Sequence, residues 1–124
     1  MRNATLSKIG IILYALVIGT FGVMHFMNAD GMAKMVPDYM PGAGKIWVYI
    51  TGAGMILAAI AFLTGKYSRL AGILLAVMLL IFILTLHVPG IMNADEATKG
   101  MYMGNLLKDT AIAGAALIIA GRTR

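Results

Sequence analysis

The sequence contains no cysteine. Disulfide bonds, iron–sulfur clusters, zinc–thiolate sites and thiol redox relays all need a cysteine sulfur, so this absence excludes each of them. A four-helix oxidoreductase that passes electrons from thiols to quinone is excluded on the same ground. No iron–sulfur or thiol chemistry is therefore expected of this chain.

Charged residues are also scarce. They make up 12 % of the 124 residues, whereas apolar residues make up 60 %. A soluble domain carries about 25 % charged residues. A chain this short cannot bury so much apolar surface in a core of its own, so the lipid bilayer must cover it. The basic residues lie at the ends of apolar runs and not among aromatic residues, a pattern that indicates membrane topology and no nucleic-acid surface.

Four apolar runs have roughly the length of 20 residues that spans the hydrocarbon core of a bilayer. Membrane-spanning helices are expected at residues 6–24, 45–64, 70–86 and 104–121. Residues 25–44 and 87–103 then form two outer loops, and Pro89-Gly90 is expected to end the third span. Short connections favour an up-down-up-down arrangement. The fold class is therefore all-α: residues 1–124 form a single domain, a polytopic membrane protein with a bundle of four transmembrane helices.

Basic residues are unevenly divided between the two sides of this bundle. The side with the termini holds Arg2, Lys8, Lys66, Arg69, Arg122 and Arg124. The loop side holds Lys34, Lys45 and Lys99 together with Asp30, Asp38, Asp95 and Glu96. The positive-inside rule then places both termini in the cytoplasm and both long loops outside.

Two features predict contacts between helices. Gly54, Ala58, Ala61 and Gly65 form one face of the second span, and such small-residue faces let a neighbouring helix approach closely. The bundle is therefore expected to bind a protein partner, or a second copy of itself, through these faces. Tyr14 lies near the middle of the first span, and a threonine on a neighbouring helix is the expected partner of its hydroxyl.

Five polar side chains are expected to meet at the outer end of the bundle. Spans one and three end there at His25 and His87, and span four begins there. Asn105, Lys108 and Asp109 follow the spacing i, i+3, i+4 and share one helix face. A carboxylate that faces one or two imidazoles forms a pair that exchanges protons, because histidine titrates near neutral pH. In the alternative interpretation, Lys108 extends to the interface and the histidines meet water.

Three cofactors fit these residue types. Two histidines on one side of the membrane can ligate a haem axially. The outer side is rich in methionine, and thioethers together with imidazole suit Cu(I). A quinone headgroup needs hydrogen-bond partners at interface depth and an apolar slot for its tail. Quinone is the favoured cofactor. The residues expected to bind it are His25, His87, Asn105, Lys108, Asp109 and Tyr39.

Several segments carry a family resemblance. The most specific are His25-Phe26, the pattern Met35-Val36-Pro37-x-Tyr39-x-Pro41 and the start of span four around Lys108. Together with the segments WVYITGAGMILAAIAFLTG and KYSRLAGILLAVMLLIFILTLH, they resemble the DoxX-like membrane proteins, a group that includes the DoxD subunit of thiosulfate:quinone oxidoreductase. The resemblance implies a four-span protein of the bacterial inner membrane that is an accessory to a quinone-linked redox system. The chain departs from the pattern at one place: many similar proteins carry a Glu in span two, near the position of Met55, and this chain has no Glu there.

Two other functions stay open. A small four-span transporter has this length, but four-span drug exporters need a carboxylate deep in the first span, and this span has none. A structural module that stabilises another membrane protein is compatible with every feature above.

Overall fold

Long helices make up most of the described chain. The computed structural model describes residues 4–34 and 44–122. The elements are α1 (Ala4–Met27), α2 (Ala29–Ala33), α3 (Gly44–Thr64), α4 (Ser68–Phe82), the π-helical turn η1 (Ile83–His87), α5 (Val88–Asn93) and α6 (Glu96–Arg122). The described residues contain no strand.

Four helices are long and apolar enough to cross a membrane. They are α1, α3, α6 and the run Ser68–Asn93, which joins α4, η1 and α5 into one helix. Large apolar side chains cover their outward faces: Leu13, Leu57, Leu84 and Leu107 are 60 % to 70 % exposed. Apolar surface on this scale needs a nonaqueous neighbour, and a bilayer supplies it. The predicted all-α membrane bundle of four helices is confirmed.

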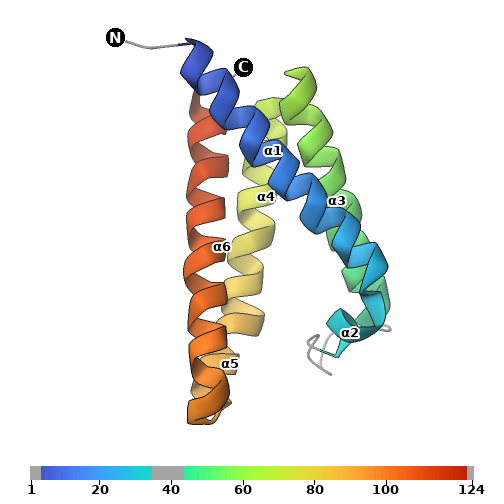
Figure 1. Ribbon diagram of the computed structural model, residues 1–124, viewed down its shortest axis with the longest axis vertical. Helices are drawn as coiled ribbons and strands as arrows, with labels where there is room; N and C mark the ends of the chain where they lie inside the picture. The colour runs from blue at the N-terminus through green and yellow to red at the C-terminus, as the bar shows by residue number, and fades with distance from the viewer. Residues whose placement is uncertain (1–3, 35–43, 123–124) are drawn as a thin grey trace.

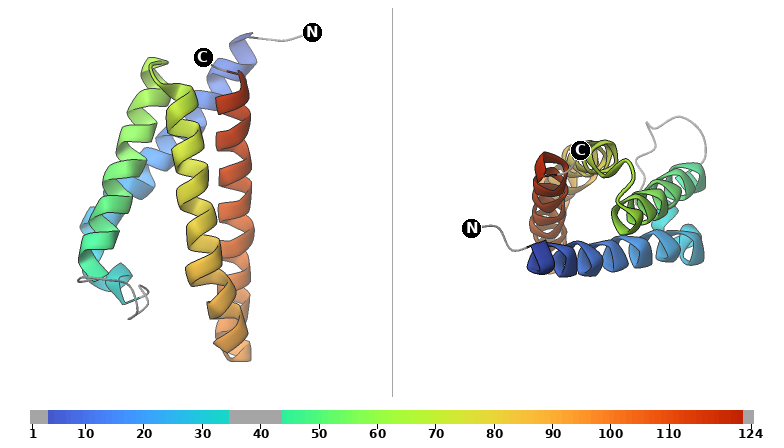
Figure 2. Two further views of the ribbon diagram at one scale, coloured as in Figure 1. Left: turned by 180° about the vertical axis from the view of Figure 1, so that it is seen from behind. Right: turned by 90° about the horizontal axis from the view of Figure 1, so that it is seen from above.

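The four long helices pack as two pairs. α1 lies along α3, α4 lies along α6, and α3 also touches α4. A turn joins α3 to α4, with Gly65 and Tyr67 in the left-handed conformation. The start of α1 and the end of α6 lie near this turn (Figure 1), and we call this the basic end because Lys8, Lys66 and Arg122 lie there. The two pairs diverge toward the opposite end, called the wide end, as Figures 1 and 2 show.

Glycines set the closest helix approaches. α1 crosses α3 at Gly22 and Gly52, where a Cβ added to Gly52 would lie 2.8 Å from the Cβ of His25 and 2.9 Å from the carbonyl oxygen of Gly22. α4 meets α6 at Gly72, where a Cβ would lie 2.6 Å from the carbonyl oxygen of Ala116. Helices in lipid gain stability mainly from such close packing, because lipid tails are as apolar as the side chains. The first crossing fixes the position of His25.

The small-residue face predicted on the second span is used within the molecule. Ala58 is buried in the core. A Cβ added to Gly54 would lie 3.8 Å from the sulfur of Met78 in α4. Gly65 belongs to the turn that follows α3. These positions therefore serve the contact between α3 and α4, and association with a partner or a second copy through them stays a prediction.

One hydrogen bond between side chain and backbone joins the two helix pairs through the core. The hydroxyl of Tyr14 in α1 donates to the carbonyl oxygen of Ile112 in α6 at 2.7 Å. The prediction of a threonine partner is wrong, because most threonines of the spans donate to carbonyl groups of their own helices. The Tyr14 ring packs against Phe62 of α3, with centroids 5.7 Å apart. Both rings belong to the core around Ile18 and Leu79, which are fully buried.

The third span does not end at Pro89-Gly90 as predicted. The helix widens into the π-helical turn Ile83–His87 and continues as α5. Here the N–H of Val88 donates to the carbonyl of Ile83, five residues earlier. Proline has no N–H, and in an α-helix its ring collides with the carbonyl four residues before it. The wider turn accommodates Pro89 without ending the helix, and such turns occur often at functional sites.

The predicted outer loop at residues 87–103 is mostly helical. α6 begins at Glu96, which leaves Ala94 and Asp95 as the connection. Asp95 caps α6: its Oδ1 accepts hydrogen bonds from the N–H and the hydroxyl of Thr98, at 3.0 Å and 2.9 Å. The Thr98 bonds favour the carboxylate and hold the pKa of Asp95 below its ordinary value. Hydropathy could not reveal this extension, because the added turns of α6 are polar.

The other predicted loop, residues 25–44, is partly helical as well. It contains the last turn of α1 and the short helix α2. Nζ of Lys45, at the start of α3, lies 2.5 Å from Oδ1 of Asp30 in α2. This ion pair fastens α2 to α3 at the wide end.

Candidate binding site

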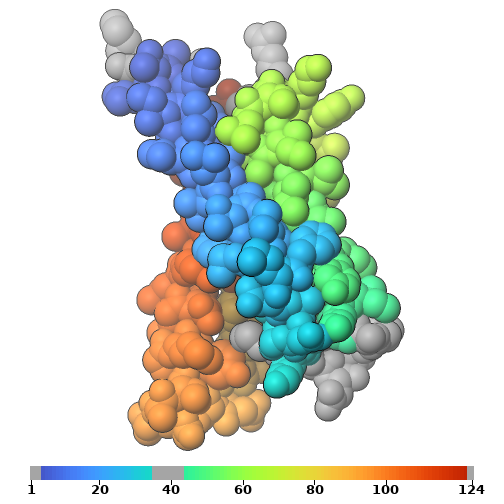
Figure 3. Space-filling view, turned by 45° about the vertical axis from the view of Figure 1, so that its right-hand side comes forward, coloured from blue at the N-terminus to red at the C-terminus, as the bar shows by residue number. Residues whose placement is uncertain are grey.

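A cavity of about 320 Å³ lies between the two helix pairs, toward the wide end. Side chains of α1, α3, α4, η1 and α6 line it, together with Met32 of α2. Figure 3 shows the surface hollowed between the outer part of α6 and the corner where α1 meets α2. Ligand sites commonly measure about 300–1,000 Å³, so the cavity has room for a small headgroup.

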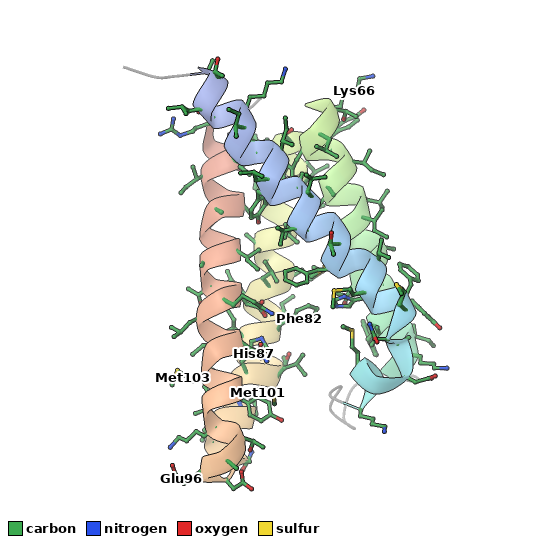
Figure 4. All side chains as sticks on the ribbon, in the orientation of Figure 1. Lys66, Phe82, His87, Glu96, Met101 and Met103 are labelled. Carbon is green, nitrogen blue, oxygen red and sulfur yellow. The ribbon has the colours of Figure 1, made fainter. Side chains whose placement is uncertain are left out.

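A buried histidine–carboxylate pair forms one wall of the cavity. Nε2 of His87 lies 2.6 Å from Oδ2 of Asp109, and the two residues are 5 % and 8 % exposed. Figure 4 shows His87 beside α6, at the level where the pairs diverge. Nδ1 of His87 is buried and has no hydrogen-bond partner among the described residues. Buried polar atoms almost always have a hydrogen-bond partner, so Nδ1 of His87 is an exception within the described chain.

Lys108 supplies a positive charge next to this pair. Its Nζ lies 3.8 Å from Oδ1 of Asp109 and 5.1 Å from the centre of the Phe21 ring in α1. The ammonium offsets the charge of the carboxylate, and the aromatic face stabilises the ammonium. The Lys108 side chain is nearly half exposed, and its extension to the membrane interface stays a prediction.

Further polar groups that line the cavity have hydrogen-bonding atoms without a partner among the described residues. Nδ1 of His25 donates to the carbonyl oxygen of Phe21 at 2.6 Å, which leaves Nε2 as an acceptor. Asn105 of α6 and the buried Thr51 of α3 also line the cavity. Within the described part of the chain, neither of these two side chains is hydrogen-bonded. Both side chains are therefore available to water or to a polar ligand in the cavity.

Comparison with known proteins identifies a family. A model of the family described as "Domain of unknown function (DUF8561)" matches residues 14–120. The chain belongs to this family. No curated protein and no solved structure matches the chain. The cavity lining, from Ile18 to Ile112, falls entirely inside the segment that the DUF8561 match covers.

In this DUF8561 chain, the cavity brings together all but one of the residues predicted to bind a cofactor. They are His25, His87, Asn105, Lys108 and Asp109. The sixth, Tyr39, lies outside the described residues. Cofactor binding by these residues stays a prediction.

Several cavity residues were not among those predicted from the sequence. Thr51 could have been found, because it is the only polar side chain in the interior of the second span. Phe21, Trp47 and Phe82 also line the cavity. They carried no signal, because aromatic residues are ordinary components of apolar helices.

The metal alternatives differ in how well they fit. No group of three or more His, Asp and Glu among residues 4–34 and 44–122 could hold a metal ion. An axial haem role for His87 would require breaking its bond to Asp109, which the arrangement does not favour. Thioethers fit better, because Met24, Met32 and Met55 line the cavity alongside His25. Soft thioethers with an imidazole are the donors that Cu(I) prefers.

Proposed function

We propose that the cavity binds the headgroup of a membrane quinone, and that the protein is a quinone-binding accessory subunit of a membrane redox system. One observation supports the proposal above all. The buried His87–Asp109 pair borders a cavity, and other polar side chains that line this cavity have hydrogen-bonding atoms without a partner in the described part of the protein. The resemblance to DoxX-like proteins points the same way. This chain departs from that resemblance near Met55, a cavity residue, because it lacks the Glu that many of those proteins carry there.

The polar groups match the needs of both redox forms of the headgroup. A quinone presents two carbonyl acceptors, and a quinol presents two hydroxyl groups that also donate. The Asn105 amide and the Thr51 hydroxyl can each donate and accept, and neutral His25 offers an acceptor at Nε2. Reduction of a quinone takes up two electrons and two protons. In this proposal a partner protein supplies the electrons, and the His87–Asp109 pair exchanges protons beside the headgroup.

The apolar wall of the cavity suits the rest of such a ligand. Apolar side chains of α1 and α4 line the cavity between the two helix pairs. They are Ile18, Phe21, Leu79 and Phe82. An isoprenoid tail could leave between these pairs directly into lipid, while the headgroup stays with the polar residues. Pockets of this kind, mostly apolar with a few convergent polar groups, are the usual form of small-molecule sites.

We further propose that the protein resides in a bacterial inner membrane with both termini in the cytoplasm. The charges support this orientation. Within the described chain, the basic end carries Lys8, Lys66, Arg69 and Arg122 and no Asp or Glu. The positive-inside rule assigns such an end to the cytoplasm, which puts the cavity near the periplasmic interface.

The experiment measures quinone that co-purifies with the protein from its native membrane. We expect wild-type protein to retain about one quinone per chain. Asp109→Asn should retain about one tenth of that amount or less, because it removes the charge-assisted hydrogen bond between Asp109 and His87. Asp95→Asn is the matched control: it makes the same carboxylate-to-amide change just before α6, outside the cavity, and asparagine also caps helices. Quinone-free wild-type protein, or equal retention by Asp109→Asn, would refute the proposal.

Copper is the second candidate function, and the cavity thioethers favour it. Metal analysis of the same preparation decides between the two. Stoichiometric copper that is lost in Met55→Leu, with no quinone present, would assign the site to Cu(I). A partner protein retained at a fixed ratio by Asp109→Asn, with full activity of the complex, would instead indicate a structural module.

A further inference from the structure

A second, larger cavity opens at the basic end of the molecule. This groove has a volume of about 850 Å³ and lies between α1 and α6, with the end of α3 as its floor. Its α1 wall runs from Ala4 to Tyr14, and its α6 wall from Ala115 to Arg122. The groove is separate from the candidate quinone site, since the two share no lining residue.

The groove has the depth of one lipid leaflet. Ala4 to Tyr14 is a rise of about 15 Å at 1.5 Å per residue, or half of a hydrocarbon core of about 30 Å. Tyr14 closes the deep end, because its hydroxyl donates to the carbonyl oxygen of Ile112 in α6 and its ring packs against Phe62. Ile11, Ile12 and Ile118 supply apolar walls between that closure and the mouth.

Two cations border the mouth of the groove. Lys8 and Arg122 line it from α1 and α6, and neither has an ion-pair partner among the described residues. Side chains on a helix lean toward its N-terminus, so Lys8 leans toward the basic end and can place its ammonium at the interface. The hydroxyl of Ser7 lies on the same wall.

The charges of the whole chain decide what fits there. The acidic residues of the described chain are Asp30, Asp95, Glu96 and Asp109, and all of them belong to the wide-end half. A second copy in the same membrane orientation would therefore bring further cations to the groove and no carboxylate. A zwitterionic lipid would place a choline or ethanolamine cation beside Lys8 and Arg122.

We propose that the groove between α1 and α6 is a site for one anionic glycerophospholipid. The phosphate and its negatively charged headgroup contact Lys8 and Arg122, and an acyl chain lies in the groove down to Tyr14. Basic pockets between transmembrane helices on the cytoplasmic side recognise anionic lipid headgroups in this way. The bound lipid fills the space between two helices that are otherwise joined at the level of Tyr14, and so supports the contact between the two pairs.

Native mass spectrometry of the full chain in detergent tests this site. Phosphatidylglycerol and phosphatidylcholine with identical acyl chains compete for the protein. We expect wild-type protein to hold one phosphatidylglycerol in preference to phosphatidylcholine. Each cation contributes about fivefold to such a preference, so Lys8→Ala/Arg122→Ala should lower it about 25-fold. Lys66→Ala/Arg69→Ala removes two cations from the same end outside the groove and should leave the preference within about twofold.

The outcomes separate a site from general attraction. An equal loss in both double variants would overturn the proposal, because it would show attraction to the basic end as a whole. Equal binding of the two lipids by wild-type protein would overturn it too. Lys8→Arg/Arg122→Lys keeps both cations and should keep the preference, so loss of binding through misfolding is distinguishable from loss of the charges.

Discussion

At the scale of single residues, Tyr14 makes the contact between the helix pairs that is simplest to remove. Tyr14→Phe keeps the ring against Phe62 and deletes only the bond to the carbonyl of Ile112. Such bonds contribute about 0.5–1.5 kcal/mol, and about 0.6 kcal/mol on average between membrane helices. We expect the free energy of unfolding to fall by about this amount when it is measured by titration with a denaturing detergent in mixed micelles.

Tyr67→Phe is the control for this measurement. It makes the same chemical change at a residue that is 77 % exposed in the turn at the basic end. Its hydroxyl has no hydrogen bond among the described residues, so the unfolding free energy should stay within about 0.5 kcal/mol of wild type. Equal effects of the two substitutions would show that the bond to Ile112 contributes nothing.

The meeting of His25, His87 and Asp109 at one cavity could be predicted from the sequence for a topological reason. Alternating spans place the ends of spans one and three beside the start of span four, whatever the detailed packing. The 2.6 Å contact between His87 and Asp109 could not be predicted. It depends on the π-helical turn, which changes the direction of His87 relative to α4.

At the scale of helices, the crossing of α1 and α3 depends on two glycines. In Gly52→Ala, the new Cβ would meet the Cβ of His25 at 2.8 Å and the backbone oxygen of Gly22 at 2.9 Å. Neither atom can rotate away, so the helices must separate. Overpacking of this kind costs about 1–3 kcal/mol, and we expect that loss in the same detergent titration.

Gly10→Ala provides the comparison within α1. A Cβ at Gly10 would meet no atom within 4 Å, and alanine favours a helix over glycine by up to about 1 kcal/mol. This variant should therefore be as stable as wild type or more stable. If Gly52→Ala unfolded at the same mole fraction of denaturing detergent as wild type, this result would contradict the packing of α1 on α3.

The boundaries of the helices were harder to predict than their existence. Apolar runs of membrane length specify the spans, because only a helix satisfies its backbone inside lipid. The ends depend on local bonds that hydropathy does not report: the cap of Asp95 on Thr98 extends α6, and the π-helical turn carries the third helix past Pro89. The close approaches at Gly52 and Gly72 hold the helices together within each pair, and the apolar runs gave no signal of the divergence between the pairs.

At the scale of the whole molecule, the proposed orientation separates the two sites by function. The cavity proposed for quinone lies toward the wide end, and the groove proposed for lipid opens at the basic end. If the basic end faces the cytoplasm, protons exchanged by the His87–Asp109 pair reach the periplasmic side, and the groove draws its lipid from the cytoplasmic leaflet. In this proposal, the unequal distribution of charge determines which side of the membrane each of the two cavities faces.

Single-cysteine variants test this orientation cleanly, because the chain has no cysteine of its own. Met92 at the wide end and Tyr67 in the turn at the basic end are 78 % and 77 % exposed. In intact bacterial cells, we expect a membrane-impermeant maleimide to label Met92→Cys and to leave Tyr67→Cys unlabelled until the inner membrane is permeabilised. The reverse pattern would invert the assignment of both sites to their sides of the membrane. Labelling of both variants in intact cells would mean that the excess of Lys and Arg at the basic end does not set one orientation.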